Sequence, residues 1–363
     1  MKRTISIITC QPDPDYIRAM VLRGSISSLP TWHVNIIKNH RVGIFRYVEV
    51  AYKLWMDKIK NNPDVYLLTF RGYEMLPWLL FVAKDKPVIF DEFINAYEWM
   101  VFEHNLIEQN GLVGRIFNAI YSRLLRSCHA VLTDTHPHAA LSSRLSKVPG
   151  DKYHVIPVGT DEQLFRPHKA GVKSEGFEVF FYGSILPLHG LRTMLDAAIL
   201  LKDESNISFT FVGIRSEHQA EVNTAIFLGA RISYEGYVDF ANLPRYMHNA
   251  SLCLAGPFGN TFQSQYVITG KTFQFLAAGC PTVIGASLAS DLFKDRENSL
   301  VVPQGNSGAL AESILWAQKN PEKLAQIAHA GHELYKAAYS NQVIADLLQP
   351  ILNSAVETCD SHV

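Results

Sequence analysis

Residues 180–190 read FFYGSILPLHG, and this stretch decides the fold class. Its apolar start predicts a β-strand that ends at Gly183, and a helix is expected to begin near Gly190 after a short loop. Glycine lets a backbone approach a ligand closely, and a helix N-terminus offers unpaired N–H groups to a diphosphate, to which His189 could donate a further hydrogen bond. An ordinary strand–loop–helix joint also contains glycine, so this stretch alone leaves a structural and a ligand-binding interpretation open.

The same alternation of short apolar runs and longer helical patterns extends along the whole chain. Strands are expected at residues 4–9, 65–70, 87–90, 130–133 and 153–157, and again at 178–182, 208–212, 232–234, 251–254 and 281–284. Helices are expected at residues 46–60, 112–127, 191–201, 241–249, 272–278, 308–318, 321–335 and 342–357. The polar stretch 165–176 between the two series predicts a linker.

These elements predict an α/β fold of two Rossmann-like domains that face a cleft. The expected domains are residues 1–168 and 169–341, with the last helix packing back on the first domain. In such sheets a ligand binds beside the carboxyl ends of the strands.

Composition restricts the class of function. The chain has 363 residues, of which 18% are charged, and its net charge of −1 argues against a nucleic-acid binder. Five scattered cysteines without a CxxC pair indicate free thiols in a reducing compartment, so we expect a cytoplasmic protein. The sequence shows no signal peptide and no apolar run long enough to cross a bilayer. No GxGxxG follows the first strand, which argues against a nicotinamide oxidoreductase.

A second stretch carries groups suited to phosphate and sugar hydroxyls. Residues 256–261 read GPFGNT and residues 270–281 read GKTFQFLAAGCP. Lys271 and Gln274 lie three positions apart in an expected helix, so an ammonium and an amide share one face. The alternative is that Phe273 and Leu276 bury this helix while its polar side chains face water.

Several short motifs together resemble the group 1 glycosyltransferases, a retaining, family 4-like set with the GT-B fold. The chain reads VIPVGTD at 155–161, GYV at 236–238, AAGCPTV at 277–283 and ENSLVVP at 297–303, all close to that family's pattern. The stretch PLHG at 187–190, and Gly259 with Thr261 and Lys271, resemble a bacterial branch of the family. Residues 90–97 and 132–136 match it more loosely.

The resemblance implies an enzyme that moves a hexose from a UDP- or GDP-sugar to a hydroxyl of a carbohydrate or lipid-linked acceptor. It implies retention of anomeric configuration, no metal, no separate cofactor, and a role in cell-surface polysaccharide, glycolipid or glycoconjugate synthesis. The second domain would bind the nucleotide sugar and the first domain most of the acceptor.

The resemblance also implies which residues of this chain form the site, by matching its positions to the family's motifs. The implied catalytic residues are Lys271 and His189, with Asp91 or Glu92 orienting the acceptor or sugar. The implied donor-binding residues are Gly183, Ser184, His189, Gly190, Gly213, Val238, Phe258, Gly259, Asn260, Thr261, Thr269, Lys271 and Gln274.

The chain departs from the family at one pair of positions. Two glutamates eight residues apart would fall on Tyr266 and Gln274, so neither carboxylate is present. This departure leaves two alternatives open, a non-catalytic sugar-nucleotide-binding partner of another transferase and a sugar-nucleotide epimerase or hydrolase on the same fold.

The first half of the chain also carries a basic amphipathic segment, residues 46–60. Such a helix can lie on anionic lipid, which would place the protein peripherally on the inner face of the membrane. We favour the alternative of an ordinary helix with an apolar side on the core and a basic side in water. The pairs Asp13/Asp15 and His136/His138 lack a ligand framework, and we expect no metal site.

Overall fold

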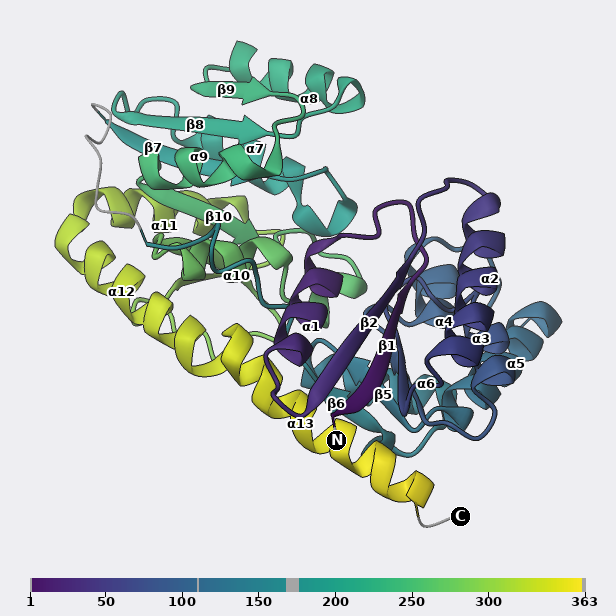
Figure 1. The fold of residues 1–363 in the computed structure, drawn as a ribbon. Coiled ribbons are helices and arrows are strands. Elements are labelled where there is room, and N and C mark those ends of the chain that lie inside the picture. The colour runs from purple at the N-terminus through teal and green to yellow at the C-terminus, as the bar shows by residue number, and fades with distance from the viewer. Residues whose placement is uncertain (1, 110, 168–175, 361–363) are drawn as a thin grey trace. The chain divides into compact units, whose positions relative to one another are not determined.

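The computed structural model describes residues 2–109, 111–167 and 176–360, which form two compact units (Figure 1). Unit 1 comprises residues 1–159 and 341–363, and unit 2 comprises residues 160–340. The predicted boundary between residues 168 and 169 lies outside the described residues. None of the described helices combines the length and the apolarity that crossing a bilayer requires.

Unit 1 is built on a parallel sheet with the strand order β2-β1-β3-β4-β5-β6. Its strands are β1 (Arg3–Thr9), β2 (Trp32–Lys38), β3 (Val65–Leu68), β4 (Val88–Asp91), β5 (Ala130–Thr133) and β6 (Tyr153–Val155). Its helices are α1 (Ile17–Ser27), α2 (Phe45–Lys60), α3 (Leu76–Ala83), α4 (Ala96–Glu98), the π-helix η1 (Trp99–Glu103), α5 (Leu112–Ser127), α6 (His136–Ser146), the turn η2 (Gly150–Lys152) and α13 (Asn341–Asp360).

Alternate residues of these strands point to opposite faces of the sheet, and both faces are covered. Ile8 packs with α2, α3 and α5 on one face. Ile5 and Ile7 pack with α1 and α13 on the other face. The last helix therefore completes the core of unit 1.

Unit 2 has a second parallel sheet, in the order β12-β11-β10-β7-β8-β9. Its strands are β7 (Phe177–Tyr182), β8 (Ile207–Val212), β9 (Ile232–Glu235), β10 (Leu252–Gly256), β11 (Thr282–Ala286) and β12 (Leu300–Pro303). Its helices are η3 (Pro187–His189), α7 (Leu191–Leu200), α8 (Ser216–Phe227), η4 (Phe240–Asn242), α9 (Leu243–Asn249), η5 (Gln263–Gln265), α10 (Gly270–Ala277), α11 (Ser307–Lys319) and α12 (Pro321–Ala338).

The strand order of unit 2 reverses direction at β7. The chain moves outward from β7 to β8 and β9, and then returns to place β10 on the other side of β7. Connections on the two sides of such a switch point cover opposite faces of the sheet, which leaves a crevice between the loops after β7 and β10. These two loops are residues 183–190 and 257–261, the stretches that the sequence singles out.

All predicted strands are present, and their ends differ from the predicted ends by at most two residues. All predicted helices are also present, and their ends differ by at most three residues. The elements that the sequence did not predict are β2, β12, α1, α3, α4, α6, α8 and the short helices η1, η2, η3 and η5. Strand β2 lies at the sheet edge, where its burial is irregular and the alternating apolar pattern is weak.

Candidate functional site

Three predicted residues of unit 2 converge where β7 ends. Gly183 follows the strand, His189 closes the turn η3, and Lys271 lies in the first turn of α10. A Cβ added at Gly183 would lie 3.4 Å from Lys271 Nζ and 3.9 Å from His189 Cε1. The absence of a side chain at Gly183, whose φ is 135°, therefore leaves room beside both groups.

The Lys271 amino group is held away from water. Its side chain is 6% exposed and its Nζ lies 5.0 Å from the centre of the Phe181 ring. Within the described part of the chain it forms no hydrogen bond to a side chain and no ion pair. Burial lowers the pKa of its ammonium to about 7. An ammonium with no counter-charge in this environment suits a ligand that brings negative charge.

His189 has a defined tautomer at this site. The backbone N–H of Leu186 donates to His189 Nδ1 at 3.3 Å. Burial, and next the charge of Lys271, lower the pKa of the imidazole to about 3. The ring is therefore neutral at physiological pH, and its proton lies on Nε2, which makes it a hydrogen-bond donor.

Glycines let the two loops of the crevice touch. A Cβ at Gly190 would lie 2.4 Å from the carbonyl carbon of Phe258, and one at Gly259 would lie 2.1 Å from the carbonyl oxygen of Pro187. The backbone N–H of Gly259 donates to the carbonyl of Leu188 at 2.9 Å. No larger residue fits at either glycine without moving backbone, so both predicted glycines fix the shape of the site.

A cavity of about 300 Å³ lies at the carboxyl ends of β7, β8 and β9. Four predicted donor-binding residues line it, namely Gly183, Ser184, Gly213 and Val238. Gly213 also packs against Gly183, because a Cβ there would lie 2.5 Å from the Gly183 carbonyl oxygen. Gly183 thus borders both this cavity and the Lys271 and His189 side chains. The size of the cavity suits a planar base.

The loop after β10 is tied to the end of β12. Thr261 N–H donates to Ser264 Oγ at 3.1 Å, and Ser264 Oγ donates to Gln304 Oε1 at 2.9 Å. Asn260, next to this turn, is exposed. Farther along, Thr269 Oγ1 donates to the carbonyl of Ala255 at 2.8 Å, which sets the start of α10.

Two further predicted residues of unit 2 are buried. The Phe258 side chain is fully buried in the core of unit 2, so only its backbone is available to a ligand. Gln274 is 3% exposed and lies one turn after Lys271 on α10.

Asp91 and Glu92 belong to unit 1 and are both fully buried. Asp91 accepts a hydrogen bond from Arg18 Nε at 2.8 Å, and the two residues form an ion pair at 2.7 Å. Glu92 accepts hydrogen bonds from Tyr121, at 2.6 Å, and from Ser142. Burial raises the pKa of its carboxyl. Both carboxyl groups are held by partners within unit 1, and through Arg18, Tyr121 and Ser142 they tie the end of β4 to α1, α5 and α6.

The two weak metal motifs also have structural partners. Asp15 pairs with Lys38 and Arg23, each at 2.6 Å, and His138 Nδ1 lies 2.7 Å from Asp134. Among the described residues, no group of three potential ligands is arranged to hold a metal ion.

Sequence reasoning missed several residues of the site. Tyr182, Arg215 and Tyr237 line the cavity, and Gln304 anchors the loop at Thr261. Tyr182 and Tyr237 each lie next to a predicted strand end or a glycine, and Arg215 lies two residues after Gly213, which were the available signals. Gln304 carried none, because only the pairing of β11 with β12 brings it near Ser264.

Residues 176–320, which lie within unit 2, match the family model described as glycosyl transferases group 1. The matched residues make up most of unit 2 and less than half of the chain. No curated protein matches the chain in sequence.

Three of the similar solved structures cover nearly all of this chain. HepE from Anabaena, in complex with UDP and glucose, is 14% identical, with 97% of this chain and 100% of that chain covered and a TM-score of 0.73. Sucrose-phosphate synthase from Thermosynechococcus elongatus is 15% identical, with 98% and 100% covered and a TM-score of 0.75. A glycosyltransferase from Rickettsia africae is 13% identical, with 98% and 99% covered and a TM-score of 0.70. At these identities the likeness establishes the fold, which is GT-B.

Proposed function

We propose that this protein is a metal-independent, retaining hexosyltransferase that uses a UDP- or GDP-sugar and an acceptor hydroxyl. The observation that carries the proposal is the convergence of Gly183, His189 and Lys271 at the switch point of unit 2. The family model that unit 2 matches and the binding of UDP-glucose by the similar HepE support a UDP-sugar donor. A role in cell-surface polysaccharide, glycolipid or glycoconjugate synthesis follows from the resemblance in sequence.

The chemistry assigned to these residues is electrostatic. When the bond from the sugar to the diphosphate breaks, negative charge develops on the departing phosphate. The Lys271 ammonium, His189 Nε2–H and the free N–H groups at the start of α7 are the donors available to this charge. The base would occupy the cavity beside Gly213 and Val238, and Gln274 would hydrogen-bond ribose hydroxyls through its amide.

Unit 1 would supply the acceptor-binding residues. The buried state of Asp91 and Glu92 favours an indirect role, in which they fix the strand ends that carry the acceptor contacts. Accordingly, conservative replacement of either residue should affect stability before it affects the chemical step.

A panel of nucleotide sugars tests the function. We expect isothermal titration calorimetry to show binding of a UDP- or GDP-sugar, slow nucleotide release without acceptor, and faster release when an acceptor sugar or glycolipid is added. Lys271→Ala should reduce turnover about tenfold to a thousandfold. Anomeric coupling constants of the product, measured by NMR, test retention. Wild-type turnover in a folded Lys271→Ala protein would remove Lys271 from the mechanism.

One observation favours a second candidate, a sugar-nucleotide-binding partner without activity of its own. Neither family glutamate is present, since Tyr266 and Gln274 stand at those positions. An amide binds ribose less strongly than a carboxylate. Tight binding of nucleotide sugar with no turnover on any acceptor, together with restored turnover in a Gln274→Glu variant, would support this candidate.

A further inference from the structure

One surface of unit 1 exposes an apolar stripe where a helix would ordinarily present polar side chains. On α2, Phe45, Val48, Tyr52, Trp55 and Ile59 follow each other at steps of three and four residues and so share one face. The residues of α2 that pack on the core are Val50, Leu54 and Asp57. The expectation that the apolar side of this segment faces the core is therefore incomplete, because α2 has a second apolar side that faces outward.

Helix α3 packs beside α2, and α5 packs beside α3 (Figure 1), and both helices also expose apolar side chains. On α3 the outward residues are Trp78 and Phe81, and the Trp78 ring lies 6.4 Å from that of Trp55 and 5.5 Å from that of Phe81. On α5 they are Leu112, Val113, Ile116 and Ile120. We call these eleven residues the α2–α3–α5 face, and their exposed fractions range from 38% to 67%. Contiguous apolar surfaces of this kind mark interaction sites.

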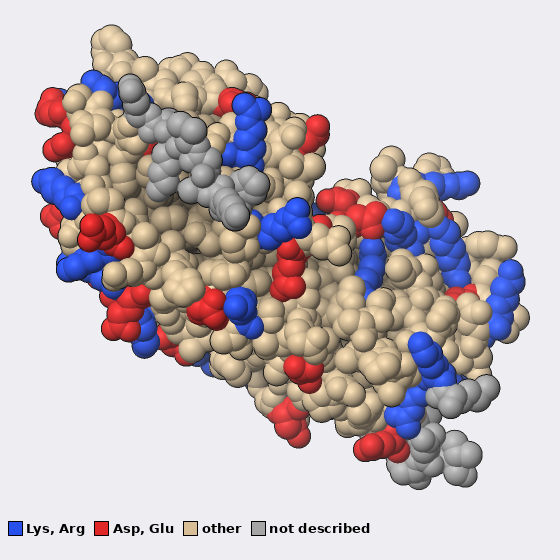
Figure 2. All heavy atoms as spheres, turned by 60° about the vertical axis from the view of Figure 1, so that its left-hand side comes forward, with Lys and Arg blue, Asp and Glu red and all other residues tan. Residues whose placement is uncertain are grey.

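The charges on the same helices are mostly positive. Helices α2, α3 and α5 together carry seven Lys and Arg residues and two acidic residues. Within the described part of the chain, Lys53 is the one of the seven that forms an ion pair. Lys60, Arg115 and Arg123 are all exposed beside the apolar stripe. Lys and Arg side chains are prominent on the surface of unit 1 in Figure 2.

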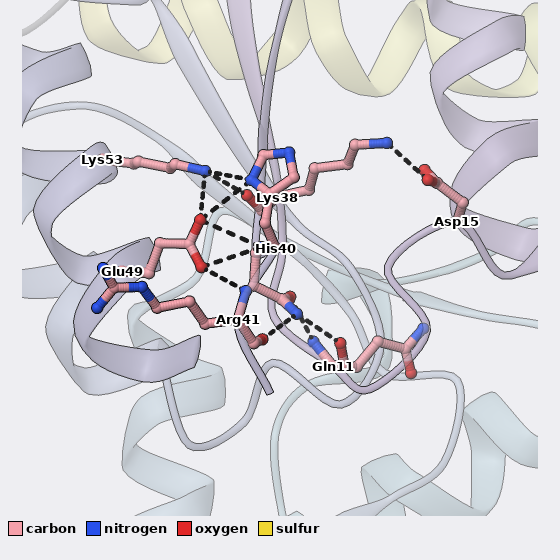
Figure 3. Close-up of polar contacts among 8 residues, drawn as sticks. Gln11, Asp15, Lys38, His40, Arg41, Glu49 and Lys53 are labelled. Carbon is pink, nitrogen blue, oxygen red and sulfur yellow. Dashed lines mark hydrogen bonds and ion pairs between the residues drawn. The ribbon is translucent and has the colours of Figure 1, made fainter. Parts of the chain in front are cut away.

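The two acidic residues of these helices are withdrawn from this surface. Asp57 is buried and accepts hydrogen bonds from Ser6 and Asn61, each at 2.6 Å. Glu49 accepts a hydrogen bond from the backbone N–H of Arg41 at 2.8 Å and another from Lys53 Nζ at 2.7 Å. Both contacts are drawn as dashed lines in Figure 3. Glu49 offsets the charge of Lys53, and the three helices together keep a net positive charge.

The Glu49 contacts also order the apolar tip before α2. Glu49 accepts a further hydrogen bond from the backbone N–H of His40 at 2.9 Å, so one carboxylate holds two successive amides (Figure 3). The next residues, Val42 and Ile44, are exposed. A fixed apolar tip loses less conformational entropy on docking than a flexible one.

We propose that the α2–α3–α5 face is a docking surface for an anionic phospholipid bilayer. Aliphatic and aromatic side chains enter the boundary between headgroups and acyl chains, where Trp and Tyr are favoured. The Lys and Arg side chains beside them then meet lipid phosphates. A second copy of this chain is disfavoured as the occupant, because a symmetric contact would bring the same cations together.

Vesicle co-sedimentation of the full chain tests this surface. We expect binding to vesicles of phosphatidylcholine with roughly one-third phosphatidylglycerol, weaker binding to phosphatidylcholine alone, and loss of binding in high salt. Phe81→Ser and Ile120→Ser should each lower the partition coefficient by about tenfold. Arg115→Gln combined with Arg123→Gln should lower it by about 25-fold, at roughly fivefold for each charge.

Matched controls come from unit 2. Phe227→Ser removes an aromatic side chain that is 89% exposed on α8, and Lys323→Gln removes an exposed charge on α12. Both should bind vesicles as the wild type does, and all variants should keep the wild-type melting temperature. No binding to anionic vesicles, or equal binding by face and control variants, would overturn the proposal. So would sedimentation velocity showing a dimer that only the face variants dissociate.

Discussion

Lys271 links the electrostatics of the site to pH. Burial brings the pKa of its ammonium to about 7 from an ordinary value of 10.5, so near neutral pH the unliganded protein holds a mixture of charged and uncharged side chains. A bound diphosphate favours the charged form and raises this pKa. Binding is therefore coupled to uptake of a proton, and the coupling grows as the pH rises from 7 towards 10.

We expect the affinity for UDP to fall as pH rises above about 7. The fall should approach tenfold per pH unit at the steepest, because one proton is taken up for each nucleotide bound. Titration calorimetry in buffers with different ionisation enthalpies measures that proton directly. Lys271→Arg keeps its charge throughout this range, so its affinity should be independent of pH. A wild-type affinity that stays constant from pH 6 to 9 would contradict the assignment of the charge to Lys271.

His189 should not contribute to this pH dependence. Its pKa of about 3 keeps the ring neutral throughout the range in which Lys271 titrates. A His189→Gln variant, which retains a hydrogen-bond donor, should therefore show the wild-type pH profile with a uniformly lower kcat. A shifted profile would indicate that the histidine titrates near neutrality.

At the scale of elements, the contact between the loops after β7 and β10 depends on Gly190. Its φ is 67°, and an added Cβ would lie 2.5 Å from the Gly259 nitrogen. We expect Gly190→Ala to separate the loops and to weaken UDP binding by at least tenfold, with a modest loss of thermal stability. Gly236→Ala is the matched control, because a Cβ there meets nothing within 4 Å. Wild-type affinity in Gly190→Ala would show that the loop contact does not shape the site.

Helix α4 contains a buried carboxyl group that lowers the stability of the protein as the pH rises. Glu98 at the end of α4 is 3% exposed, and burial raises the pKa of its carboxyl from 4.5 to about 7. Between these two pH values the unfolded chain loses this proton while the folded chain keeps it, so stability falls as pH rises. The cost above pH 7 is about 3 kcal/mol, because the free energy of unfolding falls by roughly 1.4 kcal/mol for each pH unit in this interval.

Glu98→Gln should remove most of this cost. At pH 8 we expect its melting temperature to exceed that of the wild type by roughly 5–10 °C, whereas at pH 5 the two should nearly coincide. Differential scanning calorimetry at both pH values measures the difference. Glu108→Gln, at an exposed position, should leave both melting temperatures unchanged. A gain at pH 5 as large as that at pH 8 would mean that packing and not ionisation is responsible.

The elements also show which features the sequence predicts and which it does not. Buried parallel strands such as β5 are continuous apolar runs, so they were predicted with their ends correct. Helix α6 was missed because it begins with His136-Pro137-His138, whose role as a start capped by Thr135 is not visible in periodicity. Gly183 and Lys271 could be predicted because local motifs carry them, whereas the Ser264–Gln304 contact depends on strand pairing.

The sequence also could not predict which side of helix α2 faces the core. Helix α2 has apolar residues on two sides, and periodicity does not say which side meets the sheet. The sheet order decides this, because it brings α2 beside α3 on one face of unit 1.

At the scale of the whole molecule, the chain ends inside the unit in which it begins. Helix α13 follows unit 2 in sequence, but its buried residues Ile344, Leu348 and Leu352 pack with Ile5 and Val21 of unit 1. Unit 1 is therefore complete only when the last helix is present, whereas unit 2 is one continuous segment, residues 160–340. The two units should respond differently to loss of the C-terminus.

A chain that ends at Ser340 should lose the fold of unit 1 and keep that of unit 2. The truncation removes five large buried side chains, Ile344, Leu348, Ile351, Leu352 and Val356. At about 1.5–3 kcal/mol each, their loss is comparable to the whole stability of a domain. Hydrogen exchange should show rapid exchange in β1 and β3 and continued protection in β7 and β10. A chain that ends at Glu357 keeps all five and should exchange like the wild type. Protected β1 amides in the shorter chain would show that the sheet of unit 1 is stable without α13.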